Sequence, residues 1–291
     1  MLIRTLSVII ALLPFLGEAQ SFYSIKRGRN LAVSVGTGTA TYSGDLVNPK
    51  SFGKVRYNLV AGVEYYIIPS RVSLRAEAIW YRIAGSDENA NDDRVERNLS
   101  FFSNNQEVNL TGAFYILPEK SAYYQRLPIN FYVWGGVGML HFNPKAKYDG
   151  KNIALQPLQT ENVDYNRLQV VIPYGLGLRL MATPLLNVQV EGGYRTTFTD
   201  YLDDVSSRNY VDPTLLSSDL SRALSDRRRE RDPDYPASHT IGVRGNPKYK
   251  DGYFLMNVKL QYYLPTELFG GSRYNKTYRN KRKSFNPGRR R

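Results

Sequence analysis

The stretch Leu186-Asn187-Val188-Gln189-Val190-Glu191 alternates between apolar and polar residues, and the alternation continues through Tyr194-Arg195-Thr196. Side chains two positions apart lie on the same face of an extended chain, so the apolar residues share one face and the polar residues share the other. A period of two residues predicts a β-strand with two chemically different faces.

Seven further stretches show the same alternation, less regularly in the first, fourth and fifth of the whole set. Each is about 9–11 residues or longer, the length that a tilted strand needs to cross the hydrocarbon layer of a membrane. The eight predicted strands cover residues 31–42, 58–66, 72–80, 108–116, 129–141, 169–179, 186–196 and 254–262.

The connections between these strands alternate in length. Those at residues 68–71 and 181–184 are tight and that at 117–128 is moderate, whereas those at 43–55, 85–98, 143–167 and 199–251 are long. Short turns at one rim and long loops at the other are typical of outer-membrane barrels. We therefore predict an all-β fold, an eight-stranded antiparallel transmembrane β-barrel with long extracellular loops. A soluble secreted sandwich or barrel is the alternative.

The start of the fourth strand is open. The fourth strand could begin earlier, because Arg97-Asn98-Leu99-Ser100-Phe101-Phe102 could extend it beyond the membrane.

Tyrosine is frequent in this chain, and many of the 23 tyrosines lie near strand ends, where an aromatic girdle would place them. The tyrosines expected in such girdles are Tyr57, Tyr65, Tyr66, Tyr81, Tyr194, Tyr262 and Tyr263.

The first 19 residues have the features of a secretory signal peptide. Met1–Arg4 supplies a positive charge, Leu6–Leu16 is an apolar run, and Gly17-Glu18-Ala19 offers small residues at the cleavage site, so we expect cleavage after Ala19. An even number of strands would then place both mature ends in the periplasm. The expected organisation is a signal peptide at 1–19, a barrel at 20–264 and a basic, disordered periplasmic tail at 265–291.

Charged side chains fall on the polar faces of the predicted strands. Eight strands enclose a space only wide enough for side chains, so these charges should form ion pairs within a narrow lumen and not a pore or a catalytic site. The expected lumen set comprises Glu64, Arg75, Glu77, Arg179, Glu191, Arg195 and Lys259.

The formal net charge of +13 is concentrated after the last strand. Nine basic residues against Glu267 give the tail a charge of +8. Export excludes nucleic acid as its partner, which leaves an acidic protein surface, inner-leaflet lipid headgroups, or no partner at all. The candidate partner-binding residues are Arg273, Lys276, Arg279, Lys281, Arg282, Lys283, Arg289, Arg290 and Arg291.

Catalytic and metal-binding signals are weak. The chain has no cysteine, and its two histidines, His141 and His239, have no neighbours at metal-ligand spacing. A hydrolase built from a histidine and loop carboxylates, or a calcium site at Asp200, Asp203, Asp204 and Asp212, stays an alternative. We expect no enzymatic activity, no cofactor and no small-molecule substrate. The other carboxylates near this rim are Asp226, Asp232 and Asp234.

Three ordered motifs occur along the chain: Thr41–Leu46, then His141–Ala146 with Leu155–Glu161, and then Tyr194–Ser206 with Tyr210–Pro213. In these motifs the chain resembles the PorG-type outer-membrane β-barrels of Bacteroidota. The motif residues of interest are Asp45, Asn143, Pro144, Asp200, Tyr201, Asp203, Asp204 and Asp212.

The resemblance implies a component of the type IX secretion system, which in some species also supports gliding motility. PorG-type barrels are associated with a periplasmic ring of PorK and PorN and are not regarded as the translocation pore. The sequence thus predicts an outer-membrane anchor for ring proteins, held by lipid around the barrel and contacting the ring through its short turns and tail. The alternative is a structural or adhesive barrel whose long loops bind a ligand or host surface.

Overall fold

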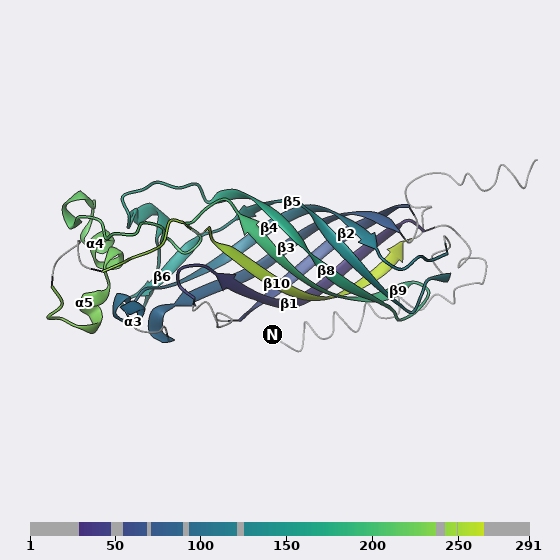
Figure 1. Cartoon of the computed structure of the whole chain (residues 1–291), viewed down its shortest axis with the longest axis horizontal. Coiled ribbons are helices and arrows are strands. Elements are labelled where there is room, and N and C mark those ends of the chain that lie inside the picture. Colours follow the sequence, from purple (N-terminus) through teal and green to yellow (C-terminus); the bar gives the residue numbers. More distant parts are fainter. Residues whose placement is uncertain are drawn as a thin grey trace, which may run out of the picture.

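Eight long antiparallel strands close into a barrel in the computed structural model, which describes residues 29–47, 55–68, 71–89, 93–120, 125–236, 242–248 and 250–264. The neighbour order is β3-β2-β1-β10-β9-β8-β5-β4, and pairing of β3 with β4 completes the circle. All eight predicted strands are confirmed (Figure 1). They are β1 (Leu31–Ser43), β2 (Arg56–Ile68), β3 (Val72–Ser86), β4 (Ser100–Tyr115), β5 (Ile129–His141), β8 (Leu168–Met181), β9 (Leu186–Thr197) and β10 (Gly252–Leu264).

The barrel wall is apolar outside and polar inside. Val35, Leu110 and Leu176 are exposed to at least half of their accessible area on the outer surface, while Glu107 and Arg179 are buried inside. A soluble barrel or sandwich would place its apolar face inward, so the inverted arrangement excludes the soluble alternative and fits a wall surrounded by lipid. None of the helices in the described residues is both long and apolar enough to cross a membrane.

Strand β4 is longer than the predicted strand. It begins at Ser100 and pairs with β3 up to Ser86, so both strands rise above the rest of the wall. The residues before Val108 carry four successive polar side chains, Asn104 to Glu107, which obscure the alternation in the sequence. The extension that Arg97–Phe102 suggested is therefore present from Ser100 onward.

A hairpin that was not predicted continues the sheet above β4. Strands β6 (Pro144–Tyr148) and β7 (Lys151–Ala154) pair with each other, and β6 pairs with β4 at Phe102 and Ser103. The turn between them is Asp149-Gly150, and both residues have positive φ (46° and 73°). That dipeptide favours a two-residue hairpin turn, so the signal is present inside a segment that the sequence predicts to be a loop.

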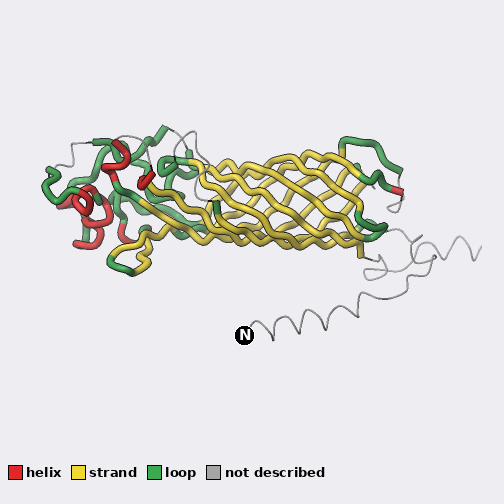
Figure 2. Tube along the Cα trace, turned by 90° about the horizontal axis from the view of Figure 1, so that it is seen from below, coloured by secondary structure: helices red, strands yellow, loops and turns green. Residues whose placement is uncertain are grey.

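The helices α3 (Asp93–Arg97), α4 (Asp219–Ser225) and α5 (Arg228–Arg231) lie at the long-loop end of the described chain in Figure 1, and Figure 2 shows most of the helical segments at that end. Helix α5 falls within the strongly charged 227–233 segment, and its Arg228 is buried. At the opposite, short-turn rim, the first residue of β1, Leu31, pairs with the last residue of β10, Leu264. The predicted signal peptide and basic tail lie outside the described residues. The helices are η2 (Asp87–Asn89), α3 (Asp93–Arg97), η4 (Gln156–Leu158), η5 (Pro213–Leu215), α4 (Asp219–Ser225) and α5 (Arg228–Arg231).

Candidate functional site

Four of the predicted lumen charges form a closed ring of ion pairs, which we call the lumen charge cluster: Arg75, Glu77, Glu191 and Lys259. Arg75 lies 2.7 Å from Glu77 and 2.8 Å from Glu191, and the ammonium of Lys259 lies 2.7 Å from each of the same carboxylates. All four side chains are buried. Two positive and two negative charges therefore balance inside the barrel, as buried charges require.

Glu64 lies next to this cluster but is held by neutral donors. Its carboxylate accepts hydrogen bonds from Ser73 (2.5 Å), Tyr115 (3.0 Å) and Gln261 (2.5 Å). The sequence suggests an ion-pair role for Glu64. The structure places hydroxyl and amide groups against its carboxylate instead. Arg75 is the cross-strand partner of Glu64 on β3, but its guanidinium pairs with Glu77 and Glu191.

The remaining two predicted lumen arginines pair with glutamates that the sequence did not suggest. Arg179 forms an ion pair with Glu119 from the connection between β4 and β5, and Arg195 lies 3.4 Å from Glu107 of β4. Both glutamates were missed because Glu107 precedes the predicted start of its strand and Glu119 belongs to a predicted loop. The inward face of an extended β4 would have revealed Glu107.

Aromatic rings fill the lumen between the charge cluster and the short-turn rim. Tyr66 stacks on Tyr263 with ring centroids 5.5 Å apart, and Tyr115 lies 5.0 Å from Tyr132. The expectation that Tyr66, Tyr81 and Tyr263 belong to outer girdles is wrong, because all three are buried on the inner face. The alternation of side chains along each strand places these three tyrosines on the inner face, although they lie near the strand ends.

A second apolar cluster closes the lumen on the side of the long loops. It includes Ile79, Tyr81 and Ile83 of β3, which follow Arg75 and Glu77 on the same inward face. Tyr81 stacks on Tyr253 of β10 at 5.1 Å. Aromatic, charged and apolar layers thus succeed one another from the short-turn rim to the long-loop rim.

Above the lumen, the described loop residues pack into an ordered lid, the loop cap, formed by residues 44–47, 87–99, 142–167, 198–236 and 242–251 within the described ranges. At its base the hydroxyl of Tyr42 lies 2.5 Å from Asp251 and 2.8 Å from Asp203. Backbone N–H groups of Leu202 and Val205 donate to the same two carboxyls. Burial raises the pKa of both Asp203 and Asp251 well above the usual range for an aspartate.

The middle of the loop cap is organised around Asp204 and Arg244. Asp204 accepts hydrogen bonds from Thr160 (2.5 Å) and Tyr165 (2.7 Å), and burial raises its pKa to about 6. Arg244 pairs with Glu161 and donates to the carbonyl oxygens of Asp204 and Ser225, both at 3.1 Å. Two loops that are far apart in sequence are joined here by buried polar contacts.

Asp45 connects the loop after β1 to the same cap, and Asp200 makes a contact within the loop after β9. The side chain of Asp45 accepts from the N–H of Asn246 at 2.7 Å, and Asp200 accepts from Ser206 at 2.8 Å. Burial raises the pKa of Asp200 to about 6 and also raises that of Asp45. Tyr201 stacks on Tyr165 with centroids 4.8 Å apart.

The other motif residues have local structural positions. The N–H of Asn143 donates to Ser103 (2.9 Å), Pro144 opens β6, and Asp212 caps η5 by accepting from the N–H of Thr214 (2.9 Å). The other five motif residues, Asp45, Asp200, Tyr201, Asp203 and Asp204, take part in the contacts of the loop cap described above. Their partner Glu161 comes from the connection between β5 and β8, whereas Arg244 and Asp251 come from the far end of the connection between β9 and β10. No spacing in the sequence indicates that these residues meet.

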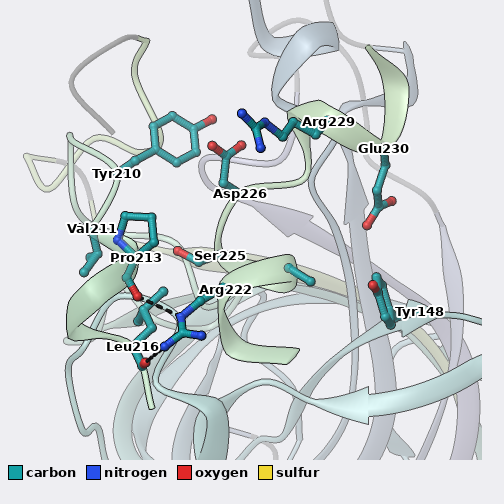
Figure 3. Close-up of a pocket in the computed structure, with 11 residues that line it drawn as sticks. Tyr148, Tyr210, Val211, Pro213, Leu216, Arg222, Ser225, Asp226, Arg229 and Glu230 are labelled. Atoms are coloured by element: carbon teal, nitrogen blue, oxygen red, sulfur yellow. Dashed lines mark hydrogen bonds between the residues drawn. The ribbon is translucent and has the colours of Figure 1, made fainter. Parts of the chain in front are cut away.

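A pocket of about 440 Å³ opens at the outer end of the loop cap (Figure 3). Pro213, Leu216 and Ala223 supply an apolar wall, and Tyr210, Asp226 and Arg229 gather at one end of the pocket. The Nε of Arg229 donates to Tyr235, while the guanidinium extends toward Asp226 and Tyr210. Apolar walls with a few polar groups are typical of ligand-binding pockets.

The alternatives that involve metals or catalysis have no assembled site in the described chain. Within those residues, no group of three or more histidine, cysteine, aspartate or glutamate side chains could hold a metal ion, and the candidate calcium ligands Asp200, Asp203, Asp204 and Asp212 do not form one. His141 is exposed at the end of β5, as are Asp232 and Asp234 in the last loop. His239 lies outside the described residues.

Comparison with known families identifies one match. A family described as "Domain of unknown function (DUF6089)" matches residues 6–219. The chain belongs to the DUF6089 family. The matched region contains β1 to β9 and all eight motif residues, while β10 follows it. No curated protein matches this DUF6089 chain.

Solved structures similar to this DUF6089 protein are outer-membrane barrels. Neisserial surface protein A shares 8% identity, covers 80% of this chain and 97% of its own, and has a TM-score of 0.41. A major outer membrane protein from Thermus thermophilus shares 12% identity over 80% of this chain and 99% of its own, with a TM-score of 0.41. Ail, the attachment invasion locus protein of Yersinia pestis, shares 10% identity over 81% of this chain and 100% of its own, with a TM-score of 0.37.

Proposed function

We propose that this protein is a non-conducting, non-enzymatic anchor in the outer membrane, and that it holds the periplasmic ring of a type IX secretion system. The observation that carries the anchor role is the occupied lumen. The lumen charge cluster fills the middle of the barrel, with aromatic residues below it and the apolar cluster and loop cap above it. A barrel with a filled lumen can contact other molecules only through its two rims and its outer wall.

The secretion role is supported by the resemblance of the three motifs to PorG-type barrels. The motif residues Asp200, Asp203 and Asp204 are buried in the loop cap, and Asp45 is half-buried there. These residues hold the long-loop rim closed. The short-turn rim is then the surface that contacts the PorK- and PorN-like ring proteins. In this orientation both chain ends are periplasmic, and an N-terminal signal peptide directs export.

The basic tail is the proposed ring-binding element. Its charge of +8 would attract an acidic protein surface, and the attraction would weaken as salt is added. The two arginine and lysine groups that carry most of this charge are residues 279–283 and 289–291. Interleaved Tyr274, Tyr278 and Phe285 would add apolar contact area.

Affinity purification of the tagged full-length chain from detergent-solubilised outer membranes tests the proposal. Ring lipoproteins should be recovered with the full-length chain, and deletion of residues 273–291 should reduce their recovery while the barrel stays inserted. A tail in which all nine basic residues are changed to glutamine separates charge from length. Failure of the full-length protein to recover any ring protein at low salt would contradict the secretion role. Unchanged recovery after the deletion would show only that the tail is not the ring-binding element.

A second candidate function, binding of a surface ligand, is favoured by the pocket at the outer end of the loop cap. Deletion of residues 215–247 would test it poorly, because that segment includes Arg244 and Ser225, which hold the cap together. Arg229→Ala and Leu216→Ser alter the pocket with less effect on the cap. Loss of adhesion in these variants, with ring recovery unchanged, would support a surface-binding protein, and normal adhesion would contradict it.

A further inference from the structure

The barrel wall has an irregular place where β2 begins late. Pairing of β1 with β2 runs from Leu31 to Ala40, whose partner is Arg56. Beyond this point β1 continues to Ser43 beside β10, and β3 continues to Ser86 beside β4. Between these two extended strands, the described residues provide no continuation of β2.

A groove of about 490 Å³ lies on the wall at this place, and we call it the β2 groove. Its outward-facing lining includes Thr37, Tyr57, Leu59 and Trp80, with Arg82, Asn104 and Gln106 farther along β3 and β4. Leu59 is 61% exposed and Trp80 is 49% exposed, so both side chains are available at the surface.

The β2 groove lies at the upper edge of the apolar belt. On β3 the outward series runs Leu74, Ala76, Ala78, Trp80 and then changes to Arg82. On β4 it runs downward from Asn104 and Gln106 to the apolar Val108 and Leu110. This change from apolar to polar side chains marks the level of lipid headgroups, where tryptophan and tyrosine are enriched.

One group in the β2 groove favours a specific ligand atom. The guanidinium of Arg82 lies over the ring of Phe102 at 4.1 Å and has no carboxylate partner in the described part of the chain. The exposed amides of Asn104 and Gln106 lie on the same outer face, and Asn104 is the cross-strand partner of Arg82. A phosphate suits the planar guanidinium, and hydroxyl groups suit the amides.

We propose that the β2 groove binds one phosphorylated glycolipid from the leaflet on the long-loop side. Arg82 binds the phosphate, and the amides of Asn104 and Gln106 bind sugar hydroxyl groups. One acyl chain lies along Trp80 and Leu59. A glycolipid fits better than a glycerophospholipid because two neutral amides lie beside the guanidinium of Arg82, and a sugar offers several hydroxyl groups to match them.

Native mass spectrometry of the full-length protein in detergent, with lipid A as the probe, tests this inference. Arg82→Gln should weaken retention of the first lipid A about tenfold, because a charge-assisted contact is lost. Arg71→Gln is the matched control, since the guanidinium of Arg71 lies over Phe114 at 5.0 Å near the short-turn rim. Dephosphorylated lipid A should bind equally to wild type and Arg82→Gln.

Three outcomes would overturn the inference. The first is wild-type protein that retains no lipid A. The second is equal loss in the Arg82 and Arg71 variants, which would indicate general attraction to the barrel surface. The third is displacement of lipid A by phosphatidylglycerol at equal concentration, which would show that the groove does not recognise the sugar. Heat-modifiable migration on gels verifies that each variant is a folded barrel.

Discussion

Arg75 and Glu191 join opposite walls of the barrel through an ion pair of 2.8 Å. Arg75 belongs to β3 and Glu191 to β9, and three strands separate these two in either direction around the circle. The contact therefore spans the full width of the lumen. Lys259 from β10 completes the cluster by contacting both Glu77 and Glu191.

Replacing Arg75 by alanine should destabilise the barrel strongly. The change leaves Glu77 and Glu191 buried with only Lys259 as a counter-charge, and breaking a buried ion pair typically costs about 3–5 kcal/mol. Urea unfolding of protein inserted in lipid vesicles, followed by tryptophan fluorescence, measures the change. Asp219→Ala, which removes the exposed partner of Arg222, should leave the free energy of unfolding nearly unchanged. Similar effects of the two substitutions would contradict a structural role for the cluster.

Gly177 and Gly112 should respond differently to alanine. A Cβ at Gly177 would lie 2.2 Å from the ring of Tyr132 inside the lumen, whereas one at Gly112 would have its nearest neighbour, the carbonyl oxygen of Ser73, at 3.9 Å. Overpacking of this kind costs about 1–3 kcal/mol, so Gly177→Ala should lower the free energy of unfolding by that amount. Gly112→Ala should be neutral or slightly stabilising. A neutral Gly177→Ala would show that the aromatic layer is loosely packed.

Arg244→Ala should open the loop cap and leave the barrel closed. Arg244 is 1% exposed, and its loss removes the ion pair with Glu161 and the hydrogen bonds to Asp204 and Ser225. Limited proteolysis should then cut within residues 199–236 much faster than in wild type. The heat-modifiable gel shift of the barrel should remain, and its loss would show that cap and barrel fold as one cooperative unit.

The loop cap should be more stable in mild acid than at neutral pH. The pKa of Asp204 is raised from 3.8 to about 6, so the folded cap favours the protonated carboxyl. This contribution to stability is complete below about pH 4 and is lost as the pH rises through 6. Asp200, Asp203 and Asp251 have raised pKa values as well and act in the same direction.

Hydrogen exchange of residues 199–206, corrected for the intrinsic pH dependence of exchange, measures this effect. Protection at pH 5 should exceed that at pH 7.5 by about tenfold from Asp204 alone. Asp204→Asn keeps an acceptor for Thr160 and Tyr165 without ionising, so it should reduce the pH dependence. Protection that rises with pH, or an unchanged slope in Asp204→Asn, would contradict the assignment.

The barrel was predictable because its strands alternate between apolar and polar residues. The apolar residues face lipid on the outside, and the polar residues face the lumen. Leu186 to Thr196 shows this most clearly, and its inward residues Asn187, Gln189 and Glu191 are all buried in the structure. The alternation also indicated which charges face the lumen. It could not indicate which charges meet, because that depends on the stagger between strands, as the pairing of Arg195 with Glu107 shows.

The loop cap was much less predictable. Asp204 and Arg244 lie 40 residues apart in one loop and Glu161 lies in another, and their contacts depend on tertiary packing and not on any local period. The β6–β7 hairpin is different, because Asp149-Gly150 is a local signal for its turn. The two strands it joins are only five and four residues long, which is too short for their alternation to stand out.

The pairing of β1 with β10 sets the order in which the barrel can be completed. Leu31 pairs with Leu264, a sequence separation that places this fold among those with high contact order. Until β10 is available, β1 and β9 would both present unpaired edges that invite association with other chains. The residues of β10 must therefore be synthesised before the wall can seal, and a chaperone that shields β1 during this interval would limit aggregation of the newly made protein.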